Sequence, residues 1–320
     1  MKSFRVIFAA VILYITAVTA SATQYLIPGG EVIGLELRDN TVTVAAFDEK
    51  LGSAAKAAGL KEGDRLICID NTQIHCAEDV RSALSKAQGR VSISVMRDDK
   101  TKRLTVLPTA TAEGPKLGVY LREGTSGVGT VTYYDPESGD FAALGHGVNS
   151  KNGNILKVNS GSIYAARVQS VKKGAVGTPG QLMGVLTKKE SIGTIAKNTA
   201  QGIFGTLSAP AGAVPLPTAD RSEVRAGAAT IRSTVDGSAL REYSVEILKI
   251  YPNSTERSRN MLIKITDPAL LSATGGIVQG MSGSPIIQDG KLVGAVTHVL
   301  VNDPTTGYGI FIENMLDAAA

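Results

Sequence analysis

The stretch Gly275–Val299, GGIVQGMSGSPIIQDGKLVGAVTHV, decides how the rest of the chain is interpreted. Its centre reads Gly280-Met281-Ser282-Gly283-Ser284-Pro285. Glycines at these spacings favour a tight turn with an exposed serine hydroxyl, because glycine permits positive φ and a close approach of a substrate backbone. In such a turn the N–H groups of Gly280 and Ser282 can converge on one point, which is what a tetrahedral oxyanion needs.

The residues after this turn predict a β-hairpin. Ile286-Ile287 and Leu292–Val296 are apolar runs on either side of Asp289-Gly290, a hairpin turn signal. A Gly-x-Ser-Gly-x-Pro pattern followed by a hairpin resembles the nucleophile loop of chymotrypsin-like serine peptidases. The alternative is a glycine-rich turn between two buried strands, so the remainder of the chain has to decide between the two interpretations.

Composition favours a β-rich protein of about two ordinary domains. The chain has 320 residues, of which 43% are hydrophobic, with 35 glycines and no tryptophan. Many glycines and few aromatics indicate tight turns rather than helical bundles. The net charge of +4 is small and spread out, without the basic block that marks nucleic-acid binding. We therefore expect no nucleic-acid partner.

The first residues predict an export signal. Lys2 and Arg5 precede an apolar run from Val6 to Val18, and Ala20-Ser21-Ala22 follows it. A charged start, an apolar middle and small residues at the end are typical of a secretory signal. Residues 1–22 are thus expected to be a signal peptide, or a signal anchor that holds the chain to the membrane if it stays uncleaved.

Residues 28–108 are predicted to form one α+β module. The run Ala54–Ile67, AAKAAGLKEGDRLI, resembles the PDZ family in the form found in exported bacterial proteases, and the resemblance implies a groove that takes a peptide as an added strand. The stretch matching the family's carboxylate-binding loop is Gly34-Leu35-Glu36-Leu37. Glu36 replaces a glycine of that loop, so internal segments are alternative ligands. Cys68 and Cys76 both lie in this module, and whether they pair is left open.

The remainder is predicted to be a separate β domain. Residues 109–115, TATAEGP, form a small-residue linker. Residues 116–320 contain many short strand-like runs separated by turns, and the one long amphipathic helix is expected at Ile312–Ala318. This pattern suggests a closed β architecture with room for two small barrels.

A serine nucleophile needs a base, and the chain has three histidines. His146 lies between two glycines at a strand end, free to project into a cleft, and is the predicted base. His298 follows the strand after the serine hairpin and is the rival, with a possible place in the substrate cleft. His75 is expected on the surface of the first module.

The acid that orients the base is not chosen by spacing alone. Asp267 ends an apolar strand before Pro268 and could hold a fixed carboxylate there, although Asp-Pro is also an ordinary turn signal. The other candidates are Asp135, Asp140, Asp236, Asp289 and Asp303.

Three segments together resemble the stage IV sporulation protein B family of serine peptidases: Leu144–Val148, Ile265–Leu271 and Gly275–Gly309, preceded by an exported PDZ module. The resemblance implies a chymotrypsin-like double β-barrel, with Ser282 as nucleophile, His146 as base and Asp267 as acid. It also implies signalling proteolysis between the two membranes of a developing spore, on a membrane-associated regulator that holds an intramembrane protease inactive, together with self-cleavage. We expect no metal and no organic cofactor. The competing hypothesis is a non-catalytic PDZ scaffold with an inert β domain.

Overall fold

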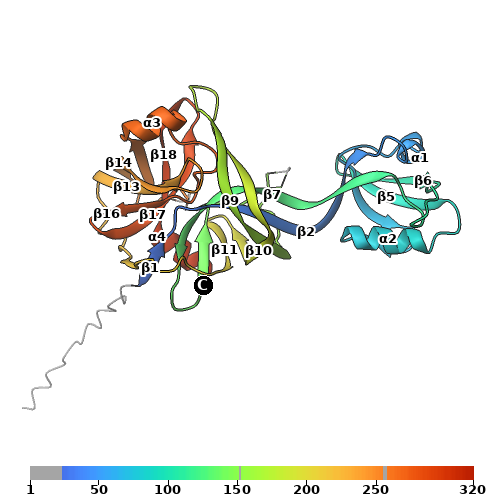
Figure 1. Ribbon diagram of the computed structural model, residues 1–320, viewed down its shortest axis with the longest axis horizontal. Coiled ribbons are helices and arrows are strands. Elements are labelled where there is room, and N and C mark those ends of the chain that lie inside the picture. Colours follow the sequence, from blue (N-terminus) through green and yellow to red (C-terminus); the bar gives the residue numbers. More distant parts are fainter. Residues whose placement is uncertain (1–23, 151–152, 255–257) are drawn as a thin grey trace, which may run out of the picture.

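The computed structural model describes residues 24–150, 153–254 and 258–320, so the expected signal at residues 1–22 lies outside it. Within these ranges no helix has both the length and the apolar character that a membrane crossing requires. Figure 1 shows a body of packed β-barrels and a smaller module at the far end of a long two-stranded ribbon.

The first barrel is a ring of six strands. In order around the ring they are β2 (Val32–Phe47), β7 (Val119–Tyr134), β8 (Asp140–Ala143), β11 (Gly202–Leu207), β10 (Gln181–Thr199) and β9 (Ser160–Lys172). The ring closes because Val32–Leu37 of β2 pairs with β7 on one side, while Ile33–Arg38 pairs with β9 on the other. Leu35, Leu37 and Ile163 are buried in its core.

The second barrel is also closed and carries the serine hairpin. Its ring consists of β13 (Gly227–Thr234), β14 (Leu240–Ile250), β15 (Met261–Ile265), β18 (Asp303–Phe311), β17 (Lys291–Leu300) and β16 (Pro285–Gln288). Tyr243, Val245 and Ile247 alternate inward along β14, the period expected of a strand with one buried face. The predicted hairpin is confirmed: β16 and β17 are joined by Asp289 and Gly290, both at positive φ, as a type I′ turn requires.

The helices and short strands complete this double barrel. The short strands β1 (Tyr25–Pro28) and β12 (Leu216–Pro217) pair beside β7, and α3 (Pro268–Thr274) follows β15. The predicted C-terminal helix is α4 (Ile312–Ala319). Its Ile312 and Met315 pack with Tyr133 and Phe204 of the first barrel and Leu292 of the second, so one apolar cluster joins the two barrels.

The PDZ module, defined here as residues 42–123, is built on the outer halves of β2 and β7 (Figure 1). Val42–Phe47 pairs with Val119–Glu123, and the sheet continues through β3 (Arg65–Ile69), β5 (Val91–Arg97) and β6 (Lys100–Val106), with β4 (Thr72–Gln73) beside β3. Helices α1 (Ser53–Ala57) and α2 (Ala77–Ser85) complete it. Val91, Ile93 and Val95 of β5 fill its core.

A large bulge separates the barrel half of the β2–β7 strand pair from its PDZ half. Residues 38–41 of β2 stand opposite Gly124 alone, and a Cβ atom on Gly124 would lie 1.8 Å from the Leu37 carbonyl oxygen. The Asp39 carboxylate accepts hydrogen bonds from the Thr41 N–H and hydroxyl, which fixes this turn locally. The bulge therefore marks the boundary between the first barrel and the PDZ module.

The structure corrects the expected linear division of the chain. Residues 32–38, predicted to belong to the module, are a strand of the first barrel. Residues 116–123, predicted to start the β domain, form an edge of the PDZ module. The expected linker 109–115 lies inside the module, next to α2. The module is thus inserted between two paired strands of the barrel, and Cys68 and Cys76 in it are unpaired.

Candidate active site

Ser282 occupies the second position of a tight turn at the junction of the two barrels. The Ser284 N–H donates to the Met281 carbonyl oxygen at 3.0 Å, and Gly283 has φ of 98°, the signature of a type II turn with glycine in its third position. A Cβ atom on Gly283 would lie 2.1 Å from the Thr130 carbonyl oxygen. Backbone geometry and a close neighbour therefore both require glycine after the serine.

The carbonyl groups of the nucleophile loop, residues 279–282, are all hydrogen-bonded. Those of Gln279, Gly280, Met281 and Ser282 accept from the Leu182 N–H (2.8 Å), the Thr130 hydroxyl (2.6 Å), the Ser284 N–H (3.0 Å) and the Thr130 N–H (3.2 Å), respectively. In a trans peptide the N–H points away from the C=O. The N–H groups of Gly280 and Ser282 have no acceptor among the described residues, whereas Met281 N–H bonds the Val278 carbonyl. The predicted oxyanion donors are the two free amides of this loop.

His146 reaches the same place from the first barrel. After β8 the chain turns sharply through Leu144 and Gly145, which have φ of 71° and 67°. The Leu144 N–H donates to the Thr130 carbonyl, and a Cβ atom on Gly145 would touch the Thr297 side chain at 2.8 Å. Thr297 in turn accepts, through its carbonyl oxygen, a hydrogen bond of 2.8 Å from the Ser282 hydroxyl. The turn that leads to His146 thus packs against Thr297, whose carbonyl binds the serine hydroxyl, and lies next to Gly283.

The protonation of His146 follows from the hydrogen bond that its ring makes with the neighbouring residue. Its Nδ1 lies 2.9 Å from the Gly147 carbonyl oxygen. A carbonyl can only accept, so Nδ1 carries the proton and Nε2 keeps a free lone pair. Burial lowers the pKa of His146 below its ordinary value, because desolvation disfavours the charged imidazolium. The hydrogen bond to Gly147 acts in the opposite direction but is the smaller effect. His146 is therefore a neutral imidazole able to accept a proton at Nε2.

His298 lies beside His146. The two ring centroids are 5.1 Å apart and the rings are tilted by 40°. Nδ1 of His298 is buried without a hydrogen-bond partner among the described residues. Desolvation, with smaller contributions from His146 and Arg259, lowers the pKa of His298 to about 4. The structure thus brings the rival histidine to the site as a second neutral imidazole.

Asp267 has the contacts of a helix cap. It is the N-cap residue of α3, and its Oδ1 accepts from the Ala269 and Leu270 N–H groups at 2.9 Å each. Its Oδ2 lies 3.4 Å from the Ser244 nitrogen. Across the described ranges no hydrogen bond or ion pair joins a carboxylate to His146. The structure does not bring Asp267 to His146, so the triad acid expected from the resemblance finds no support in these contacts.

Other predicted acids are used elsewhere. Asp135 accepts backbone N–H groups of its own turn, Asp303 bonds Thr305 and Thr306, and Asp289 pairs with Arg225. The group that orients His146 here is the neighbouring Gly147 carbonyl. Spacing could not have indicated this contact, or the bonds of Thr130, since neither residue type is distinctive in the sequence.

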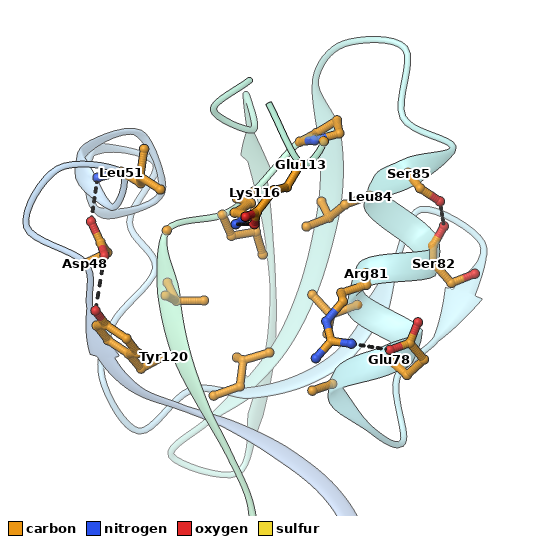
Figure 2. A pocket seen from close by; sticks show the side chains of 18 residues that line it. Asp48, Leu51, Glu78, Arg81, Ser82, Leu84, Ser85, Glu113, Lys116 and Tyr120 are labelled. Carbon is orange, nitrogen blue, oxygen red and sulfur yellow. Dashed lines mark hydrogen bonds and ion pairs between the residues drawn. The ribbon is translucent and has the colours of Figure 1, made fainter. Parts of the chain in front are cut away.

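A second site lies in the PDZ module. A groove of about 840 Å³ separates α2 from residues 113–121, with Arg81, Ser82 and Leu84 on the helix side (Figure 2). Val119–Leu121 pairs with β2 on one edge, while its other edge faces the groove without a strand partner in the described structure. An open edge beside a helix is the arrangement that accepts a peptide as an extra strand.

The predicted ligand loop was placed on the wrong segment. Gly34, Leu35, Glu36 and Leu37 are paired on both sides within the first barrel and cannot receive a ligand strand. The loop at the end of the groove is instead Lys116-Leu117-Gly118-Val119. The N–H groups of Leu117 and Gly118 have no acceptor among the described residues. Gly118 has φ of 65°, and a Cβ there would lie 2.2 Å from the Leu51 carbonyl carbon.

Comparisons with solved structures return peptidases. The active form of Rv3671c protease from M. tuberculosis is 15% identical with a TM-score of 0.37, over 60% of this chain and 72% of that one. The inactive form is 14% identical with a TM-score of 0.35, over 59% and 81%.

Comparisons with curated proteins return partial matches. A "Putative zinc metalloprotease" of Agrobacterium fabrum is 36% identical over 90 residues, which is 28% of this chain and 23% of that protein. One of the same name from Rhizobium meliloti is 31% identical over 117 residues, 36% of this chain and 29% of that protein. The chain thus spans less than a third of the length of these relatives.

Family models cover the chain in the expected order. A PDZ domain model matches residues 32–107. The model described as SpoIVB peptidase S55 matches residues 113–316, more than half of the chain. The double barrel, with a serine turn of the second barrel at the junction with the first, agrees with that match. The protein is a serine peptidase with a PDZ domain and belongs to the SpoIVB peptidase S55 family.

Proposed function

We propose that Ser282 and His146 are the nucleophile and base of this peptidase. Ser282 Oγ attacks the carbonyl carbon of the scissile peptide, and Nε2 of His146 takes the hydroxyl proton and later gives it to the leaving amine. The Gly147 carbonyl holds His146 in the required tautomer through Nδ1–H. The free N–H groups of Gly280 and Ser282 bind the oxyanion. The observation that carries this proposal is the pair of unbonded amides beside a serine hydroxyl.

The proposed cellular role is signalling proteolysis in sporulation. The protein would be exported, act between the two membranes of the developing spore, and cleave a membrane-associated regulator that holds an intramembrane protease inactive, as well as itself. Membership of the S55 family supports this role. An uncleaved N-terminal segment would hold the peptidase at the membrane.

The PDZ module would bind a peptide of the substrate or of the same chain and thereby control cleavage. Two observations support this part of the proposal. The first is the groove with its open strand edge. The second is that the single strand β7 contains both Val119–Leu121 at that edge and Thr130, which bonds the Ser282 carbonyl. Lys116–Val119 would receive the end of the peptide.

Labelling with a fluorophosphonate probe tests the catalytic proposal. The wild-type protein should form an adduct on Ser282, and Ser282→Ala should abolish it while retaining the fold by circular dichroism. Loss of the nucleophile is expected to lower peptidase activity by about 10⁶-fold if the comparison with subtilisin holds. A folded wild-type protein without an adduct would favour the alternative of a non-catalytic PDZ scaffold.

The cellular part has a separate test. In sporulating cells, Ser282→Ala should block the intramembrane cleavage that depends on loss of the regulator. Normal timing of that cleavage in the mutant would refute the signalling role, while probe labelling of the wild-type protein would still support the chemistry.

A further inference from the structure

Thr130 of β7 bonds to both halves of the candidate site. Its hydroxyl donates to the Gly280 carbonyl at 2.6 Å, and its N–H donates to the Ser282 carbonyl at 3.2 Å. Its own carbonyl accepts from the N–H of Leu144, two residues before His146, at 3.2 Å. Thr130 is fully buried and belongs to the first barrel, whereas the nucleophile loop belongs to the second. One residue therefore joins the serine loop to the turn that leads to the proposed base, His146.

The loop needs such an anchor because glycine does not fix its own conformation. Gly280 has φ of 98° and no Cβ atom to restrict rotation of its carbonyl. The peptide group between Gly280 and Met281 lies between the two free amides. The Thr130 hydroxyl holds its carbonyl at 2.6 Å, while the Met281 N–H bonds the Val278 carbonyl at 3.1 Å. Rotation of that peptide would reorient the Gly280 and Ser282 N–H groups, which bind the oxyanion in the proposed function.

We propose that the Thr130 hydroxyl is a positioning residue for the oxyanion hole. It does not touch the substrate, and it acts by holding Gly280 so that the two N–H groups meet the developing negative charge. This inference rests on the proposed function, in which Ser282 is the nucleophile. Neighbouring Thr132 on β7 offers a matched control, since it is equally buried and its hydroxyl has no hydrogen-bond partner among the described residues.

The test compares Thr130→Val, Thr132→Val and Thr130→Ser in the full chain by inactivation with a fluorophosphonate. In this reaction Ser282 Oγ bonds to phosphorus, fluoride leaves, and the hydroxyl proton passes to His146. The phosphoryl oxygen takes the place of the oxyanion, so the maximal rate kinact reports the hole, while KI reports binding. Thr130→Val should lower kinact by about 10- to 100-fold with KI unchanged, less than the roughly 10²–10³ that loss of an oxyanion donor itself costs.

The controls separate positioning from a structural role. Thr132→Val should keep wild-type kinact, and Thr130→Ser, which retains the hydroxyl, should restore most of it. Equal kinact for the two valine variants, or a change in KI alone, would overturn the proposal. If Thr130→Val does not fold, Thr130→Ala is compared with Thr132→Ala by the same criterion. A wild-type protein that is itself unreactive would instead overturn the proposed function.

Discussion

Asp267→Asn distinguishes a helix cap from a triad acid. The observed carboxylate accepts two N–H groups of α3 through a single oxygen, Oδ1, at 2.9 Å each. An asparagine side chain supplies the same acceptor, and Asn and Asp are about equally good N-caps. The substitution should therefore preserve the start of α3. It loses the long bond from the Ser244 N–H to Oδ2 and the favourable charge at the helix N-terminus, the latter about 0.3–1 kcal/mol of folding free energy.

Asp267→Ala removes the acceptor as well and is the matched comparison. Loss of an N-cap costs about 1 kcal/mol, within a range of roughly 0.5–2 kcal/mol. For a body of two barrels this lowers Tm by roughly 2–4 °C per kcal/mol. We expect Asp267→Ala to melt a few degrees below Asp267→Asn, and both to react with a fluorophosphonate at close to the wild-type rate as long as they are folded.

The assay is the second-order rate of Ser282 labelling, measured beside thermal denaturation. If Asp267 oriented His146, the Asn variant would favour the wrong tautomer and lose roughly 10⁴ in rate at normal stability. A well-folded Asp267→Asn that is slower by this amount would refute the cap assignment. It would also show that α3 moves to bring the carboxylate to His146 in the reacting enzyme.

Three further predictions concern the module and His298. Replacing residues 38–124 by Asn-Gly removes the module, and a two-residue turn can join Leu37 to Thr125 because they are cross-strand partners. The variant should keep Ser282 labelling and cleave the natural target less well. A folded but unreactive product would mean that the module assembles the site. Deleting residues 28–108 instead removes a barrel strand and should prevent folding. The free energy of unfolding should fall as the pH drops from about 6.5 towards 4. In this window His298 binds a proton in the unfolded chain but not in the folded protein, where its pKa is about 4. His298→Gln should flatten this dependence in urea titrations, and an unchanged slope would contradict it.

Local chemistry let the sequence predict the features nearest to Ser282. Glycine at positive φ and the Asp289-Gly290 pair each fix a turn through neighbouring residues alone, so the tight turn at the serine and the following hairpin could be inferred from one stretch. The C-terminal helix was likewise predictable from its own apolar spacing. The choice of His146 as the base rested on its glycine neighbours and its strand-end position, and it stays a prediction.

Only the tertiary structure decided which strands are partners. Residues 32–47 are one continuous strand whose two halves serve different domains, and nothing local in it shows that Gly34–Leu37 pairs inside a barrel. The loop at the end of the groove is consequently Lys116–Val119. The anchoring of Gly280 by Thr130 joins residues 150 positions apart, and such a contact follows from barrel packing rather than from sequence spacing. Strand pairing and barrel closure are long-range, whereas turns and caps are local, and this difference separates what the sequence determined from what the fold added.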